Sequence, residues 1–183
     1  MSEPVSKRRI HSRTIVWGAC FVFLGALGLV TAWGLTARAA TLRAFYVSSG
    51  SMAPTFLTGD RVCAELIDSP APARGEIWVF RFPRRANIGG IGIKRVVGLP
   101  GDEVEVSGGR LRINGKPVDE PYLVKPITYV LSSQKLLAGE YFLMGDDRDA
   151  SSDSHVWGPV PRDHLTGQVK YRVWPLSRLG EID

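Results

Sequence analysis

Apolar and polar positions divide the chain into two regions with different patterns. Residues 14–37 contain no charged side chain, and their apolar residues would lie on all sides of a helix. At about 1.5 Å per residue, a helix of this length is longer than the roughly 30 Å hydrocarbon core of a bilayer. After residue 37 the apolar runs are short and many alternate with polar positions, as strands do. We therefore expect one N-terminal transmembrane helix followed by a mainly β domain over residues 38–183.

The expected strands of this domain are rich in β-branched and aromatic residues, and several end at glycine or proline. Residues 103–106 and 110–113 alternate with period two on either side of Ser107-Gly108-Gly109, which predicts a β-hairpin. No long helical period follows residue 37. Five further strands are expected, at residues 61–67, 76–82, 91–98, 140–144 and 168–174.

Two other interpretations of the apolar run have to be weighed. Ala37-Arg38-Ala39 has the small-x-small form of a signal-peptide cleavage site, but the apolar run is longer than the roughly 7–15 residues usual in a signal peptide. A buried core helix would show one apolar face rather than apolar residues all round. A retained membrane anchor is the interpretation that the length and pattern favour.

Charge next to the apolar run predicts its orientation. Residues 1–13 hold four Lys or Arg and one acid, which favours a basic cytoplasmic tail, although Arg38 and Arg43 on the other side weaken the asymmetry. We expect a single-pass protein of the cell membrane with its β domain on the extracytoplasmic face. The lipid bilayer is then one of its partners.

The net charge of +5 does not indicate a nucleic-acid partner. Residues 1–43 contain six Lys or Arg and one Asp or Glu, whereas residues 44–183 contain 17 of each sign. A formally neutral exported domain lacks the basic excess typical of nucleic-acid binding. Cys20 lies in the expected anchor and Cys63 beyond it, so no internal disulfide is expected. No Cys/His cluster has metal-ligand spacing, and we expect neither a metal nor a cofactor.

The glycine-containing turn Ser49–Thr55 is a candidate site for an exposed serine nucleophile. A serine hydroxyl needs a neighbouring base, and two kinds of base are available. His155 or His164, each near an aspartate, would form a Ser/His/Asp arrangement with Ser51. Alternatively Lys94, within the apolar run 91–98, would become a base if burial lowered its pKa. The residues alone leave both open, because most lysines lie at the surface.

Four segments in the order of the chain resemble the conserved boxes of the type I signal peptidases: Ser49–Thr55, Arg74–Phe80, Lys94–Asp102 and Gly145–Ser154. One such segment would be weak evidence, but four in the same order are specific. Together with the preceding apolar run, the resemblance covers nearly the whole chain. It implies a membrane-bound serine endopeptidase with antiparallel β-sheets and a catalytic groove at one edge. The short stretch between the third and fourth segments implies that the large second domain of some members is absent.

The resemblance also implies a role for individual residues. Ser51 corresponds to the nucleophile and Lys94 to the neutral base of a Ser/Lys dyad. The Ser49 hydroxyl, with the Ser51 backbone N–H, corresponds to the oxyanion-stabilising pair. Ser151 corresponds to the hydroxyl that orients the lysine, and Asp153 to the carboxylate that supports this arrangement.

The chain departs from the family pattern at four positions near these residues. Asp147 and Ala150 replace asparagines, His155 stands where arginine is common, and Ser48 replaces a proline. None of these positions is a nucleophile, a base or an oxyanion donor. In the same acidic segment, Asp146 and Arg148 are candidates for a mutual ion pair that would fix the loop carrying Ser151.

The substrates implied by the resemblance are secretory preproteins with small residues one and three positions before the cut. An exposed groove would bind such a peptide as an added strand, and Phe45, Tyr46 and Val47 are candidate pocket walls. Three alternatives are weighed against this function. A cytosolic self-cleaving repressor would need a DNA-binding module, which the sequence lacks. A specialised peptidase for a pilin or conjugation precursor and a non-catalytic, membrane-anchored binding domain stay open.

Overall fold

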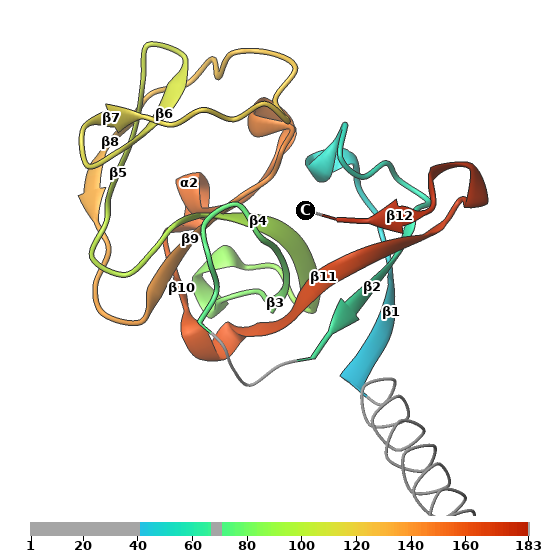
Figure 1. Cartoon of the computed structure of the whole chain (residues 1–183). Coiled ribbons are helices and arrows are strands. Elements are labelled where there is room, and N and C mark those ends of the chain that lie inside the picture. Colours follow the sequence, from blue (N-terminus) through green and yellow to red (C-terminus); the bar gives the residue numbers. More distant parts are fainter. Residues whose placement is uncertain (1–40, 67–70, 183) are drawn as a thin grey trace, which may run out of the picture. The chain divides into compact units, whose positions relative to one another are not determined.

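The computed structural model describes residues 41–66 and 71–182, which form strands joined by turns and short helices (Figure 1). The expected tail over residues 1–13 and the expected anchor over residues 14–37 lie outside the described residues. Among the described residues, no helix combines the length and the apolar character needed to span a bilayer. Residues 42–183 form one compact unit, within which the mainly β prediction is confirmed.

The larger sheet of the described residues contains the five strands that were expected outside the hairpin, and every pair in it is antiparallel. Their observed ends differ from the expected ones by three residues or fewer. In spatial order the sheet comprises β1 (Leu42–Tyr46), β2 (Arg61–Glu65), β11 (Leu165–Trp174), β3 (Ile77–Arg81), β4 (Ile91–Gly98), β9 (Glu140–Met144) and β10 (Val160–Pro161), and β12 (Gly180–Glu181) pairs with β11.

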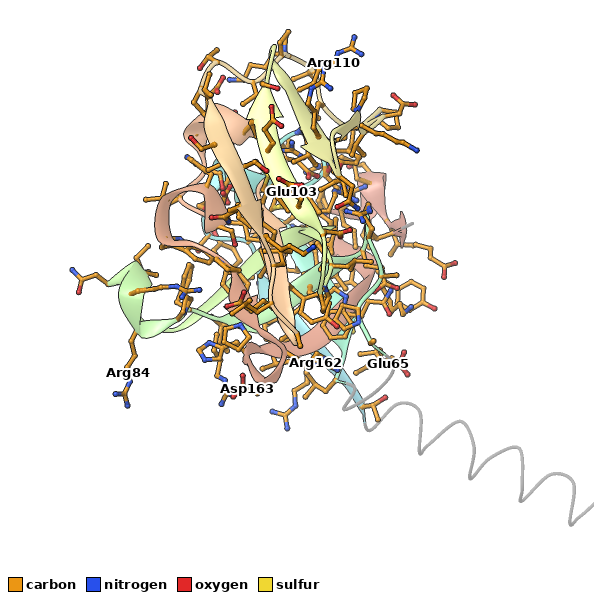
Figure 2. The ribbon with its side chains drawn as sticks, turned by 90° about the vertical axis from the view of Figure 1, so that its left-hand side faces the viewer. Glu65, Arg84, Glu103, Arg110, Arg162 and Asp163 are labelled. Carbon is orange, nitrogen blue, oxygen red and sulfur yellow. The ribbon has the colours of Figure 1, made fainter. Side chains whose placement is uncertain are left out.

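The second sheet is built around the expected hairpin. Gly108 and Gly109 both have positive φ, at 60° and 75°, which is the backbone that a two-residue hairpin turn requires. Figure 2 shows Arg110 at the tip of this hairpin and Glu103 further along its first strand. The spatial order is β7 (Lys116–Pro117), β6 (Arg110–Ile113), β5 (Glu103–Ser107) and β8 (Leu131–Lys135).

Among the described residues, five strands were not expected: the two-residue strands β7, β10 and β12, and two longer strands with weak patterns, β1 and β8. β1 has only partly buried and exposed residues, and β8 reads Leu-Ser-Ser-Gln-Lys, with three polar residues in its centre. Neither shows the period-two alternation on which strand prediction depends. Each becomes a strand because a stronger neighbour, β2 or β5, offers it an edge for pairing.

Short helices lie in the connections, and η1 (Gly50–Met52) contributes residues to the groove described below. Two others are η2 (Arg84–Ala86) and η3 (Arg148–Ala150). The remaining ones are α2 (Ser154–Trp157), η4 (Arg162–His164) and η5 (Leu176–Arg178).

Buried apolar residues form three clusters. One joins the second sheet to β9 and includes Val104, Leu111 and Phe142. Another lies under η1 and includes Met52 and Phe56. The third surrounds Trp78 and Phe80 on β3. Because β4 and β9 contribute to more than one cluster, the elements that carry the site are packed on both faces.

An ion pair fixes the turn that links β4 to β5. The Asp102 carboxylate accepts hydrogen bonds from the Leu99 N–H at 2.7 Å, from Arg74 at 2.8 Å and from the Asn114 amide at 3.1 Å. Burial raises the pKa of Asp102, but the Leu99 N–H and Arg74 together lower it by more, so its pKa lies below the usual value. Arg74 also donates to the Val97 carbonyl. Two of the four segments that carry the family resemblance are thereby joined.

We predict that Leu111→Ala lowers the free energy of unfolding by about 2–5 kcal/mol, because the substitution leaves a cavity in a packed cluster. Leu137→Ala is the matched control, since Leu137 is 67% exposed. Urea titration followed by tryptophan fluorescence measures both. Equal losses in the two variants would contradict the assigned core.

Candidate active site

The turn that carries Ser51 is held by its backbone and by two buried side chains. Ser51 lies in η1, where the Ala53 N–H donates to the Gly50 carbonyl at 2.9 Å. Met52 and Phe56 are buried beneath it. The Asp147 N–H donates to the Ser51 carbonyl oxygen at 3.1 Å, so the turn is also attached to the acidic loop. Ser51 itself is only half-buried and remains accessible from one side.

Lys94 projects from β4 to the same point. Its Nζ lies 2.5 Å from Ser51 Oγ, and the residue is 4% exposed. Burial lowers the pKa of Lys94 to about 8, because an ammonium ion loses solvation, while the charges of Asp153 and Asp146 oppose this shift. A much larger fraction of this side chain than of an ordinary lysine is therefore a neutral amine near neutral pH. In that form the Ser51 O–H can donate to Nζ.

Ser49, the expected oxyanion residue, also lies beside Ser51. Ser49 Oγ is 3.2 Å from Ser51 Oγ, and Ser49 is exposed to solvent. Its hydroxyl makes no capping bond to η1. The structure therefore brings the Ser49 hydroxyl next to the Ser51 oxygen.

Ser151 and Asp153 lie behind the dyad. Ser151 Oγ is buried and makes no hydrogen bond within the described part of the chain. It packs so closely on Gly145 that a Cβ there would overlap both Ser151 Oγ and the Ser51 carbonyl oxygen. Asp153 is fully buried and accepts from the Gly145 N–H at 2.9 Å. Only a glycine at position 145 lets the loop approach the turn this closely.

The two histidines are bonded elsewhere. His155 Nδ1 lies 2.7 Å from the Asp153 carboxylate, and His164 Nδ1 lies 2.9 Å from the Arg81 carbonyl oxygen. Among the described residues, neither histidine is hydrogen-bonded to Ser51. The geometry therefore favours the lysine over the Ser/His/Asp arrangement that the residues alone left open.

The expected ion pair between Asp146 and Arg148 is wrong. Asp146 instead accepts two hydrogen bonds from Arg95, at 2.9 and 2.7 Å, and a third from the Thr55 hydroxyl at 2.5 Å. Arg95 is the neighbour of Lys94 on β4. Only the tertiary structure shows that Arg95 is the partner of Asp146. The acidic loop, residues 145–154, is thus attached both to the turn that carries Ser51 and to β4, which carries Lys94.

Arg148 is paired with a residue that the sequence did not point to. Its guanidinium, only 1% exposed, makes a bidentate ion pair with Glu120 at 2.9 and 2.6 Å. Arg148 Nε also donates to the Gly145 carbonyl at 3.0 Å. The Tyr122 hydroxyl donates to Glu120, and the Arg95 guanidinium lies 3.9 Å above the Tyr122 ring. The segment before β8 therefore supports the loop from the other side.

A groove of about 290 Å³ leads to the dyad. Tyr46 and Val47 line it, as expected, and Val47 also packs into the core below. Phe45 does not line the groove, because it packs against the cluster beneath η1. The opposite wall was missed by the sequence analysis, since it belongs to a loop without regular pattern. The other lining residues are Ser48, Ser49, Ser51, Met52, Phe82, Ile88, Gly89, Ile91, Gly92, Ile93 and Lys94.

Comparison with protein families gives one match over residues 17–174, to the family described as signal peptidase, peptidase S26. The chain belongs to this family. It is 41% identical over 165 residues to signal peptidase I of Leptolyngbya laminosa, which covers 85% of this chain and 80% of that protein. It is 43% identical over 148 residues to probable signal peptidase I-2 of Synechocystis, which covers 78% of this chain and 68% of that protein.

A solved structure of the same family is also similar. It is the crystal structure of a signal peptidase I from Enterococcus faecalis, 30% identical, with a TM-score of 0.48. The match covers 54% of this chain and 97% of that one. The family resemblance inferred from the four segments is confirmed, and signal peptidase I relatives identify the chain as a serine peptidase.

We predict that Lys94→Met stabilises the fold below pH 8. Wild-type Lys94 has a lower pKa in the folded protein than in the unfolded chain, so between pH 8 and 10.5 the unfolded chain binds more protons. Wild-type stability therefore rises with pH in this window. The advantage of the methionine variant at pH 7 is up to about 3 kcal/mol, since one pKa unit corresponds to roughly 1.36 kcal/mol.

Denaturant titrations at several pH values measure this difference. Lys135→Met, at an exposed position of β8, is the control and should show no such pH dependence. If Lys94→Met is less stable than wild type at pH 7 and the difference does not vary with pH, the buried lysine carries no desolvation penalty.

Proposed function

We propose that this member of the signal peptidase family removes signal peptides from secretory preproteins by a Ser51/Lys94 dyad. The observation that carries the proposal is the 2.5 Å approach of the Lys94 amine to the Ser51 hydroxyl in a buried setting that lowers the pKa of Lys94. A buried amine next to an accessible hydroxyl is what activation of a serine by lysine requires. The names of its relatives support the choice of substrate.

In the first half of the reaction, neutral Lys94 accepts the proton from Ser51 Oγ while this oxygen attacks the scissile carbonyl carbon. Negative charge then develops on the carbonyl oxygen. The Ser51 backbone N–H and the Ser49 hydroxyl stabilise this charge, a contribution that is often the largest in acyl transfer. Lys94 donates its proton to the departing amine, the C–N bond breaks, and an acyl-enzyme on Ser51 remains.

In the second half, a water molecule takes the place of the departed amine. Lys94, neutral again, accepts a proton from the water as it attacks the ester carbonyl. The second tetrahedral intermediate collapses, and Ser51 Oγ leaves with the proton held by Lys94. Ser151 and Asp153 support the lysine in this scheme, with Asp153 fixed by the Gly145 N–H.

The open edge of β4 supports binding of the substrate as an extended strand. Arg95 and later residues of β4 pair with β9, whereas Ile91–Lys94 pair only with β3 within the described residues. Backbone groups beside the groove are thus available to a peptide strand. Apolar side chains such as Val47, Ile88 and Ile91 line the groove beside the serines, which suits small side chains such as alanine before the cut.

The location of the enzyme follows from the same proposal. An anchor over residues 14–37 would hold the dyad beside the bilayer, where the cleavage sites of membrane-inserted preproteins arrive. The basic tail over residues 1–13 would place the catalytic domain on the extracytoplasmic face. Protease protection of residues 1–13 in inside-out and right-side-out vesicles tests this orientation.

We predict that Ser51→Ala and Lys94→Ala each lower kcat for preprotein cleavage in detergent by about 10⁴-fold or more, because the two groups act as one unit. Ser132→Ala and Lys135→Ala change the same residue types at exposed positions of β8 and should cleave like wild type. A Lys94→Ala enzyme that still cuts, with a His155→Ala enzyme that does not, would refute the base assignment. Cleavage of a pilin precursor alone would favour the specialised peptidase.

We predict that kcat/KM rises with pH through an apparent pKa near 8, because only the neutral form of Lys94 can accept the Ser51 proton. Initial rates on a fluorogenic peptide between pH 5.5 and 10 give the profile. An optimum near pH 5 is incompatible with a neutral-lysine base.

A further inference from the structure

The Asp153 carboxylate is fully buried and has three hydrogen-bond donors. Oδ2 accepts from the Gly145 N–H at 2.9 Å, and Oδ1 accepts from the backbone N–H of His155 at 3.1 Å. The third partner is the His155 ring, whose Nδ1 lies 2.7 Å from Oδ1. The charge of Asp153 acts on Lys94 and favours its ammonium form. A change of charge beside Asp153 therefore changes how strongly Asp153 favours the ammonium form of Lys94.

The His155 ring is held in one orientation. The Tyr129 ring stacks on it at a centroid distance of 4.2 Å with an interplanar angle of 16°. The His155 side chain is 19% exposed, so the ring is partly open to water. Nδ1 is engaged by Asp153. Stacking on Tyr129 and this contact together keep the ring in place.

We propose that His155 is a positioning residue that holds Asp153 for Lys94. The His155 ring fixes the Asp153 carboxylate through Nδ1, and the charge of this carboxylate acts on Lys94. A permanent cation in place of the ring would form an ion pair with Asp153 and weaken its attraction on the Lys94 ammonium. This inference rests on the proposed Ser51/Lys94 mechanism and adds a residue that the dyad alone does not require.

Other charged groups near His155 have to be considered. Tyr129 lies near Asp149, Glu120 and Arg148, which act on the pKa of its hydroxyl, and the largest cause of the upward shift is burial. Arg148 is already neutralised by Glu120.

The elements packed against α2 add few charges. From η2, the Arg85 guanidinium lies near Gly158, at the end of α2. On β9, Tyr141 is buried against β10, and Glu140 is engaged by the Leu137 N–H. Of the charged groups described here, Asp153 is the one in ion-pair contact with the His155 ring.

A permanent cation at position 155 is the sharpest test. His155→Arg keeps a donor for Asp153 but cannot lose its charge, so we expect the acid limb of kcat/KM to move to lower pH by about one unit, the effect of one added charge in a partly screened site. His155→Ala removes the donor and should lower kcat by about tenfold, without moving the acid limb to lower pH. Recovery of kcat in His155→Arg would separate positioning from simple loss of packing.

His164→Arg is the matched control. It makes the same change of charge at a histidine that bonds the Arg81 carbonyl and makes no contact with Asp153 among the described residues. Its acid limb should coincide with that of wild type. If His164→Arg shifts the profile as much as His155→Arg does, or if neither shifts it, the proposal is overturned.

A direct titration keeps the test independent of activity. In Ser51→Ala protein, the pKa of Lys94 is followed by NMR of its side chain with and without His155→Arg. A lower Lys94 pKa in the double variant supports the proposal, and an unchanged pKa overturns it. Failure of the proposed function appears differently, as a wild-type protein that does not cleave preproteins at all. If arginine is not accommodated, His155→Gln serves instead. Its amide can still donate to Asp153, so its kcat should exceed that of His155→Ala, and equal losses of kcat overturn the proposal.

Discussion

The ion pair between Arg95 and Asp146 is the interaction on which the site depends. Successive side chains of a strand point to opposite faces, so Arg95 on one face of β4 leaves Lys94 on the other. Arg95 is fixed by two bonds to Asp146 and one to the Gly75 carbonyl at 2.6 Å. Asp146 in turn receives the Thr55 hydroxyl, from the end of the nucleophile turn. One buried carboxylate thus sets the relative positions of turn, strand and loop.

Such an arrangement is costly to disturb, because breaking one partner of a buried ion pair leaves an uncompensated charge. The second sheet contributes to the same network. Glu120 neutralises the buried Arg148, and Tyr122 packs under Arg95 as well as donating to Glu120. The segment between β7 and β8 therefore supports the site. Its Glu120 and Tyr122 contact the two buried arginines, Arg148 and Arg95, that hold the acidic loop.

The chemistry of the base arises from a balance of two opposing effects. Burial removes water from the Lys94 amine and favours its neutral form, whereas Asp153 and Asp146 favour the ammonium. Asp146 is already engaged by Arg95, so its charge is partly compensated before it reaches the lysine. Within the described part of the chain, Asp153 is bonded by backbone donors and the His155 ring but by no Lys or Arg side chain. The base is consequently most sensitive to what happens at Asp153.

The sequence by itself determined the strongly patterned strands and the hairpin at Gly108-Gly109, and it pointed to Ser51 and Lys94, which the fold brings together, because local periodicity and short motifs carry that information. Only the tertiary structure decided that Asp146 pairs with Arg95, that Arg148 pairs with Glu120 and that Phe45 packs inward while Ile88 and Ile91 line the groove. These contacts join residues 28 to 51 positions apart or depend on the path of an irregular loop. No local pattern specifies which of several buried charges will meet, since each needs a partner and the fold determines which one is within reach.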